Sequence, residues 1–186
     1  MLAKAVDAKD HYQDDKTNEL SKVAAAVAAK LEFEEDQVEA LVLATKLRDI
    51  GKIGVPRQVL QKQGKLLPEE LELLKQHPQM GEQILQEANK VKDLISAVLY
   101  HHERWDGKGY PEGLRGEEIP LMARIVGILD AYRAMRSDRP YRKALSIQDA
   151  IAELKEVAGS QFDPGLVKII VEQLQGDAEQ RLREAV

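Results

Sequence analysis

Near its start, the chain repeats apolar residues at the spacing of one helical face, and this pattern constrains the fold more than any other feature. The apolar positions follow the order i, i+3, i+4, i+7, i+8 and i+11 of an amphipathic helix. They are Leu20, Val23, Ala24, Val27, Ala28 and Leu31. The abundant residues Ala, Leu, Glu, Lys and Gln are good helix formers, whereas aromatic residues make up only 4% of the chain. The sequence therefore predicts an all-α fold.

Further helices are predicted where similar apolar patterns return between Gly and Pro residues. The predicted helices cover residues 1–11, 17–31, 34–49, 67–77, 80–88, 94–103, 121–136, 146–154 and 164–174. His77 is expected at the end of its helix, because the residue before a proline, here Pro78, disfavours the α conformation. We expect one domain over residues 1–186, with an incoming helix at 1–12, a core at 13–174 and a frayed tail at 175–186.

Composition and charge argue against several classes of function. The chain has no cysteine, which excludes disulfides and thiolate metal sites. Its 27 basic and 32 acidic residues give a net charge of −5, so no broad basic surface for a nucleic-acid polymer is expected. No apolar run approaches the length of a bilayer span, and the start of the chain does not read as a signal peptide. These features favour a cytoplasmic protein without a membrane partner.

The residues with the most distinctive chemistry lie between Tyr100 and Arg142. This stretch begins with His101, His102 and Glu103 and continues in a loop rich in Gly and Pro. Adjacent histidines before such a loop indicate a metal-binding edge. The alternative is a helix end with two solvated imidazoles.

Other candidate residues also have a structural alternative. Asp49 and Asp130 are either site residues or helix carboxylates that pair with the arginines beside them, Arg48 and Arg133. Lys52 taken alone is equally well a solvated charge.

Five separated motifs closely resemble, in order, those of the HD-GYP domain. They are residues 46–56 (KLRDIGKIGVP), residues 75–81 (KQHPQMG), HHE at 101–103 with GYP at 109–111, Asp130, and residues 137–142 (SDRPYR). The resemblance extends from about Ala5 to Leu174. It implies an HD-type helical bundle with C-terminal HD-GYP helices. Active members of this family are metal-dependent phosphodiesterases that open cyclic di-GMP, and many are output domains of response regulators.

The resemblance also implies roles for individual residues. The implied metal ligands are Asp49, His77, His101, His102 and Asp130. The implied catalytic residues are Lys52 and Asp49. The implied substrate-binding residues are Lys52, Tyr110, Arg139 and Arg142. Imidazole and carboxylate ligands suit divalent iron, manganese or a similar ion.

The chain departs from the family pattern at four positions. Glu19 and Arg48 stand where the family has histidine ligands, Arg133 replaces an aspartate, and Arg136 replaces a small polar residue. A guanidinium has no free lone pair and cannot bind a metal. We expect Arg48 to point into the site and to pair with Asp130 or Glu19, or with Asp49 if that residue binds no metal.

The predicted site thus keeps the ligands of one metal position and lacks histidine ligands of the other, and two functions are compatible with it. The first is a degenerate signalling module that is non-catalytic and acts by protein interaction or by binding cyclic di-GMP without cleavage. The second is a metal-dependent phosphodiesterase with a reduced metal site. The ligands of one metal position are all present, so one divalent ion or none is expected. The partner is either cyclic di-GMP or another signalling domain, and a homodimer is also compatible with the sequence.

Overall fold

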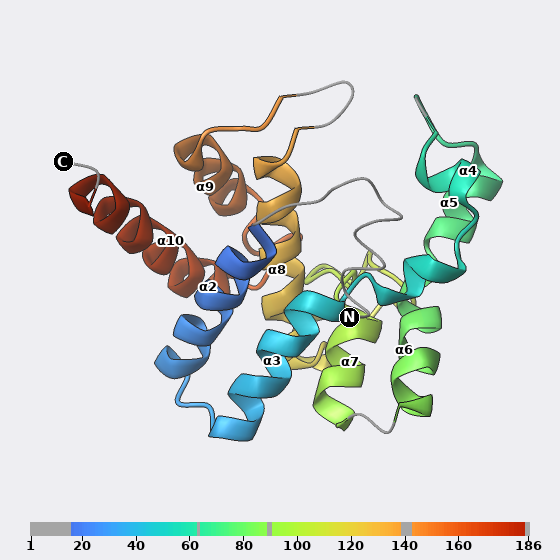
Figure 1. The fold of residues 1–186 in the computed structure, drawn as a ribbon, viewed down its shortest axis with the longest axis horizontal. Coiled ribbons are helices and arrows are strands. Elements are labelled where there is room, and N and C mark those ends of the chain that lie inside the picture. Colours follow the sequence, from blue (N-terminus) through green and yellow to red (C-terminus); the bar gives the residue numbers. More distant parts are fainter. Residues whose placement is uncertain (1–15, 63, 89–90, 139–142, 185–186) are drawn as a thin grey trace.

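The structure, a computed structural model, describes residues 16–62, 64–88, 91–138 and 143–184 (Figure 1). Its elements are, in chain order, α2 (Lys16–Lys30), α3 (Glu35–Leu47), η1 (Ile50–Gly54), α4 (Arg57–Leu60), α5 (Pro68–Leu74), α6 (His77–Glu87), α7 (Lys92–Tyr100), η2 (Gly116–Glu118), α8 (Leu121–Arg136), α9 (Ile147–Glu156) and α10 (Pro164–Glu184). These described residues contain no β-strand, so the prediction of an all-α fold is confirmed.

Helix α8 lies at the centre of the bundle, and α2, α3, α7, α9 and α10 pack against it (Figure 1). Its buried residues are Met122, Ala123, Ile125, Val126, Ile128, Leu129, Tyr132 and Met135. The apolar face predicted for the first long helix is also part of the core, from Leu20 to Ala28. Removing these side chains from water is the main favourable contribution to folding.

Two helix boundaries agree closely with the sequence prediction. Helix α8 spans Leu121–Arg136, as predicted. The predicted cap of α9 is present, because the Ser146 side chain accepts a hydrogen bond of 3.0 Å from the Asp149 backbone N–H. Such a cap satisfies one of the N–H groups that the first turn leaves without a helical partner.

Two other boundary predictions were wrong. His77 is the first residue of α6 rather than the last residue of the preceding helix, because Pro78 is accommodated in the first turn of α6. Helix α10 continues to Glu184, ten residues beyond the predicted helix end at Leu174. The Gln173 side chain donates a hydrogen bond of 2.9 Å to Asp177 one turn later, which supports this extension. The helix predicted at residues 1–11 lies outside the described residues.

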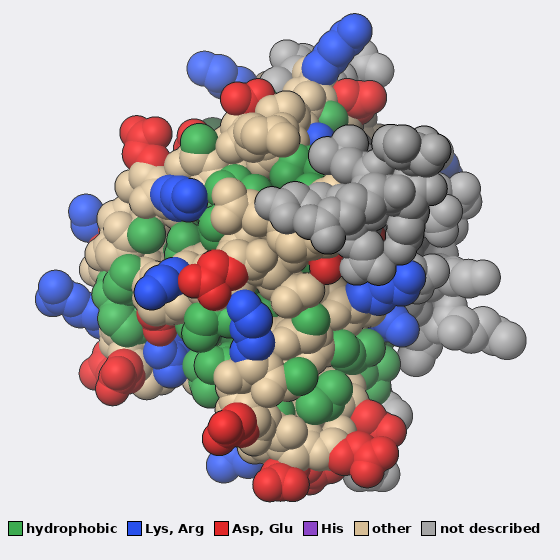
Figure 2. Space-filling view, turned by 90° about the vertical axis from the view of Figure 1, so that its left-hand side faces the viewer, with side chains coloured by type: hydrophobic (Ala, Val, Ile, Leu, Met, Phe, Trp, Pro, Cys, Tyr) green, Lys and Arg blue, Asp and Glu red, His purple; other side chains and the backbone are tan. Residues whose placement is uncertain are grey.

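The face formed around α2, α9 and α10 shows basic and acidic side chains interspersed with apolar ones (Figure 2). Among the described residues on this face, no continuous basic stripe is seen. None of the helices in the described part of the chain is both long and apolar enough to cross a bilayer.

Candidate metal centre

The predicted site residues come from four separate segments that the fold brings together. Asp49 lies between α3 and η1, and His77 is the first residue of α6. His101 follows the last residue of α7, and Asp130 lies on α8. These segments pack side by side, since α6 contacts η1 and α7, and α7 contacts α3 and α8. The predicted convergence of the histidines with Asp49 is therefore observed.

Three imidazoles form the centre of the site. The ring centroids are 5.5 Å apart for His77 and His101, 5.0 Å for His77 and His102, and 4.0 Å for His101 and His102. One ring nitrogen from each residue lies within 4.8 Å of the other two. Nitrogens that bind one ion at about 2.0–2.1 Å lie at most about 4.2 Å apart, so a small closure of these rings would let them share a single ion.

Backbone carbonyls orient two of the imidazoles. Nδ1 of His77 donates to the carbonyl of Leu74 at 2.8 Å, and Nδ1 of His101 donates to the carbonyl of Val98 at 2.7 Å. Because a carbonyl only accepts hydrogen bonds, each Nδ1 carries the proton and each Nε2 presents a lone pair. Both Nε2 atoms are buried without a hydrogen-bond partner. Buried lone pairs in this arrangement fit a divalent metal.

Burial also keeps the histidines neutral. It lowers the pKa of His77, and it lowers the pKa of His101 well below 6.5 with further repulsion from the other two histidines. Burial lowers the pKa of His102 to about 4, against the attraction of Asp130. Metal ions bind only the neutral form of imidazole, so the site is in its binding form at neutral pH.

Asp49 adds a carboxylate to the histidine cluster. Its Oδ1 lies 3.6 Å from Nε2 of His77 and 3.1 Å from Nζ of Lys52. Burial by itself would raise the pKa of Asp49, but Lys52, Arg48 and the histidines hold it well below 3.8. The carboxylate is therefore ionised, and the four groups make a donor set of three nitrogens and one oxygen.

In the other half of the site, Arg48 stands where the sequence resemblance predicts a histidine ligand. The residue is only 2% exposed. Its Nε donates to Oδ1 of Asp130 at 2.5 Å, its Nη1 donates to the Thr45 carbonyl at 2.5 Å, and its Nη2 lies 3.7 Å from Oδ2 of Asp49. Burial tends to raise the pKa of Asp130, but Arg48 and the histidines lower it to about 2. The predicted pairing of Arg48 with Asp130 is confirmed. This half of the site does not fit a metal, because a guanidinium occupies it.

The other departures from the family pattern lie together. Glu19 lines a small cavity between α2 and α8 with Leu20, Tyr132, Arg133 and Arg136. Arg136 also donates a hydrogen bond to the carbonyl of Leu145. The predicted substrate-binding residues Arg139 and Arg142 lie outside the described residues.

The loop after the histidines covers one side of the cluster. The Tyr110 ring stacks on His102 with centroids 4.8 Å apart and an interplanar angle of 26°. Nζ of Lys75 lies 5.9 Å from the Tyr110 ring centroid. Lys52 and Tyr110, both predicted to bind substrate, thus lie beside the histidines, although their roles remain predictions.

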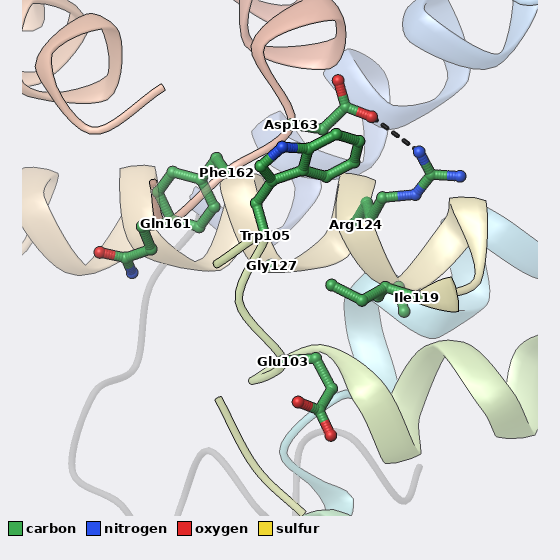
Figure 3. A pocket seen from close by; sticks show the side chains of 9 residues that line it. Glu103, Trp105, Ile119, Arg124, Gly127, Gln161, Phe162 and Asp163 are labelled. Carbon is green, nitrogen blue, oxygen red and sulfur yellow. Dashed lines mark hydrogen bonds and ion pairs between the residues drawn. The ribbon is translucent and has the colours of Figure 1, made fainter. Parts of the chain in front are cut away.

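The start of the same loop is anchored to α8 and to the segment between α9 and α10. Trp105 lies against Arg124, with the guanidinium carbon 5.7 Å from its ring centroid, and Arg124 pairs with Asp163 at 2.7 Å (Figure 3). The backbone N–H of Trp105 donates to the Gln161 carbonyl at 3.0 Å. Sequence reasoning missed Arg124 and Asp163, since neither belongs to a motif and only the fold brings them together.

The neutral histidines predict a pH-dependent stability for the metal-free protein. His102 binds its proton less tightly when folded (pKa about 4) than when unfolded (pKa 6.5), so stability is lost as the pH falls through this window. The free energy of unfolding should fall by about 2 kcal/mol between pH 7 and pH 5 for this residue alone. Asp49 and Asp130 contribute stability that is lost only below about pH 4, so they do not act in this range.

Urea unfolding at the two pH values measures this effect. The variant His102→Gln should lose only the share of the dependence that His102 contributes, about 2 kcal/mol, because His77 and His101 also have lowered pKa values and keep theirs. An unfolding free energy for the parent protein that is equal at pH 7 and pH 5 would contradict the prediction.

Comparisons with known proteins give a consistent result. The sequence pattern of the family described as HD domain matches residues 1–166. The chain is 40% identical over 172 residues to the cyclic di-GMP phosphodiesterase response regulator RpfG of Xanthomonas campestris, which covers 91% of this chain and 46% of that protein. It is 38% identical over 170 residues to a cyclic di-GMP phosphodiesterase of Thermotoga maritima, covering 90% of this chain and 45% of that protein.

A solved structure shares the fold. The crystal structure of a cyclic GMP-AMP-specific phosphodiesterase of Vibrio cholerae superimposes with a TM-score of 0.71 over 94% of this chain and 47% of that chain. The sequence identity is 19%, so this similarity concerns the fold alone. The chain spans about half the length of the curated relatives that it matches.

Proposed function

This chain belongs to the HD domain family, and from that premise we propose that it is a degenerate HD-GYP signalling module that does not hydrolyse cyclic di-GMP. It keeps one metal position and has lost the other. It acts by binding cyclic di-GMP without cleavage or by contacting another signalling domain. Its homology to cyclic di-GMP phosphodiesterases supports the signalling role.

The ion pair between Arg48 and Asp130 carries this proposal. The two side chains are 3% and 23% exposed, and Arg48 also lies near Asp49. A permanent cation at this place repels a metal ion and offers it no lone pair. In two-metal phosphodiester hydrolysis, the metals stabilise both the attacking and the leaving oxygen. A site with one metal position therefore lacks one of these two functions.

The remaining half of the site supports ligand binding. His77, His101, His102 and Asp49 would hold one divalent ion of iron, manganese or similar chemistry. When bound, such an ion supplies a Lewis acid for a phosphate oxygen. Lys52 lies at the edge of the site and would attract a phosphate, and Tyr110 borders the same site. These residues together would bind an anionic cyclic dinucleotide.

A metal-dependent phosphodiesterase with a reduced metal site is the second candidate. The observation that favours it is the complete histidine cluster, whose two orphaned Nε2 atoms suit an ion. In that case Asp49 would serve as a ligand and Lys52 would contact the substrate phosphate. The two candidates differ in whether one ion is enough for hydrolysis.

We predict no appreciable hydrolysis of cyclic di-GMP by the protein supplied with Mn²⁺ or Fe²⁺, and at most one bound ion per chain. Elemental analysis of purified protein measures the ion content. A hydrolysis assay measures turnover, and calorimetry with intact cyclic di-GMP measures binding. Turnover on the order of 1 per second or faster, abolished by His101→Ala, would establish the phosphodiesterase instead.

A further inference from the structure

Glu103 is a buried carboxylate that the candidate metal centre does not use. The residue directly follows His102 in the sequence and is 7% exposed. Its carboxylate points away from Trp105 and Arg124 (Figure 3). Sequence reasoning treated it only as part of the motif HHE, so its own role is open.

The Glu103 side chain binds the loop backbone. Its Oε1 accepts a hydrogen bond of 2.7 Å from the N–H of Glu112 and one of 2.9 Å from the N–H of Gly113. Burying a carboxylate is costly unless donors compensate it. Hydrogen bonds to a charged acceptor are roughly twice as strong as neutral ones. Two consecutive N–H groups on one oxygen therefore fix the position and direction of the chain just after Pro111.

The chain just before Pro111 is tied to the same place. The N–H of Tyr110 donates to the His102 carbonyl at 3.2 Å. Gly109 lies directly on this backbone, because a Cβ there would be 2.4 Å from the Arg104 nitrogen and 2.5 Å from Cα of Glu103. The loop is thus held on both sides of Tyr110 by residues 102–104.

We propose that Glu103 is a positioning residue that keeps Tyr110 stacked on His102 and so encloses the histidine cluster. The stacked ring restricts both the orientation of His102 and the escape of a bound ion. The second part of this inference rests on the proposed one-metal position, whereas the loop contacts do not.

Glu112 supplies a matched control in the same loop. Its own carboxylate is exposed and accepts a hydrogen bond of 3.0 Å from the Tyr100 hydroxyl. The variant Glu112→Gln removes a negative charge close to Tyr110 but leaves the backbone N–H that Glu103 accepts. It therefore separates a general effect of charge in the loop from the specific contact of Glu103.

The test compares the parent protein with Glu103→Ala, Glu103→Gln and Glu112→Gln. Amide hydrogen exchange is followed at residues 110, 112 and 113, and Co²⁺-loaded protein is mixed with excess EDTA while the visible absorbance reports release of the ion. We expect Glu103→Ala to accelerate both exchange and release about 10-fold, as for the loss of other groups that support metal ligands. Glu103→Gln keeps a hydrogen-bond acceptor, so its exchange and release rates should lie between those of Glu103→Ala and the parent. The rates of Glu112→Gln should equal those of the parent.

Exchange and release rates in Glu103→Ala equal to those of the parent would overturn the proposal, even if the melting temperature falls. If Glu103→Ala does not fold, the same comparison is made between Glu103→Gln and Glu112→Gln, and equal rates in these two variants overturn it. If the parent binds no Co²⁺, the one-metal position is contradicted, and amide exchange then decides the role of Glu103 in the loop.

Discussion

Replacing Arg48 with alanine is expected to lower the free energy of unfolding of the metal-free protein by about 3 kcal/mol. The guanidinium is buried and donates to Asp130 and to the Thr45 carbonyl. Without it, Asp130 and Asp49 remain close together as ionised groups with less compensation, which is costly in a partly buried site. Urea unfolding of the variant and the parent at pH 7 measures the difference.

Two further variants make this prediction specific. Arg57 is exposed on α4, so Arg57→Ala should change stability by no more than about 0.5 kcal/mol. Arg48→Lys keeps the positive charge but loses the planar guanidinium donors. Its free energy of unfolding should therefore lie between those of Arg48→Ala and the parent. If the free energy of unfolding of Arg48→Ala lies within about 0.5 kcal/mol of that of the parent, the buried ion pair contributes little to stability. Metal affinity should rise little in Arg48→Ala, because the change supplies no ligand.

Replacing Gly51 with alanine is expected to destabilise the protein by at least about 3 kcal/mol and to disturb the histidine cluster. A Cβ at this position would lie 1.9 Å from the carbonyl oxygen of His77 and 2.5 Å from the nitrogen of Gly81. Both neighbours are backbone atoms, so η1 and the start of α6 would have to separate. His77 would then move relative to His101 and His102, and metal binding should weaken together with stability.

Gly176 on α10 is the matched control for this change, since a Cβ there would meet no atom within 4 Å. Gly176→Ala should be neutral or stabilising by roughly 0.5–1 kcal/mol, because alanine is the better helix former. Thermal and urea unfolding of both variants, with calorimetric titration of Mn²⁺, measures the two effects. If Gly51→Ala keeps both the stability and the metal affinity of the parent, the close packing of η1 on α6 is not required.

The sequence by itself predicted the elements whose signals are local. Apolar periodicity indicated the buried face from Leu20 to Ala28, and Ser146 marked the start of α9. The motifs also indicated which histidines belong to one site. An arginine at position 48 predicted a pairing with Asp130, Glu19 or Asp49, and the pair with Asp130 is observed. These inferences succeeded because helix periodicity, capping and residue chemistry depend on near neighbours in sequence or on a recognisable pattern.

Only the tertiary structure decided how distant segments meet. Arg48 and Asp130 are 82 positions apart, and their separation of 2.5 Å depends on the packing of α3 near α8. The position of His77 at the start of α6 was also missed, because a proline is compatible with both a helix end and a first turn. The contacts of Glu103 with the loop backbone could not be predicted from residue types, because every residue other than proline has the backbone N–H that these contacts require. Long-range contacts of this kind follow from how the helices pack together, which the local pattern of residues does not specify.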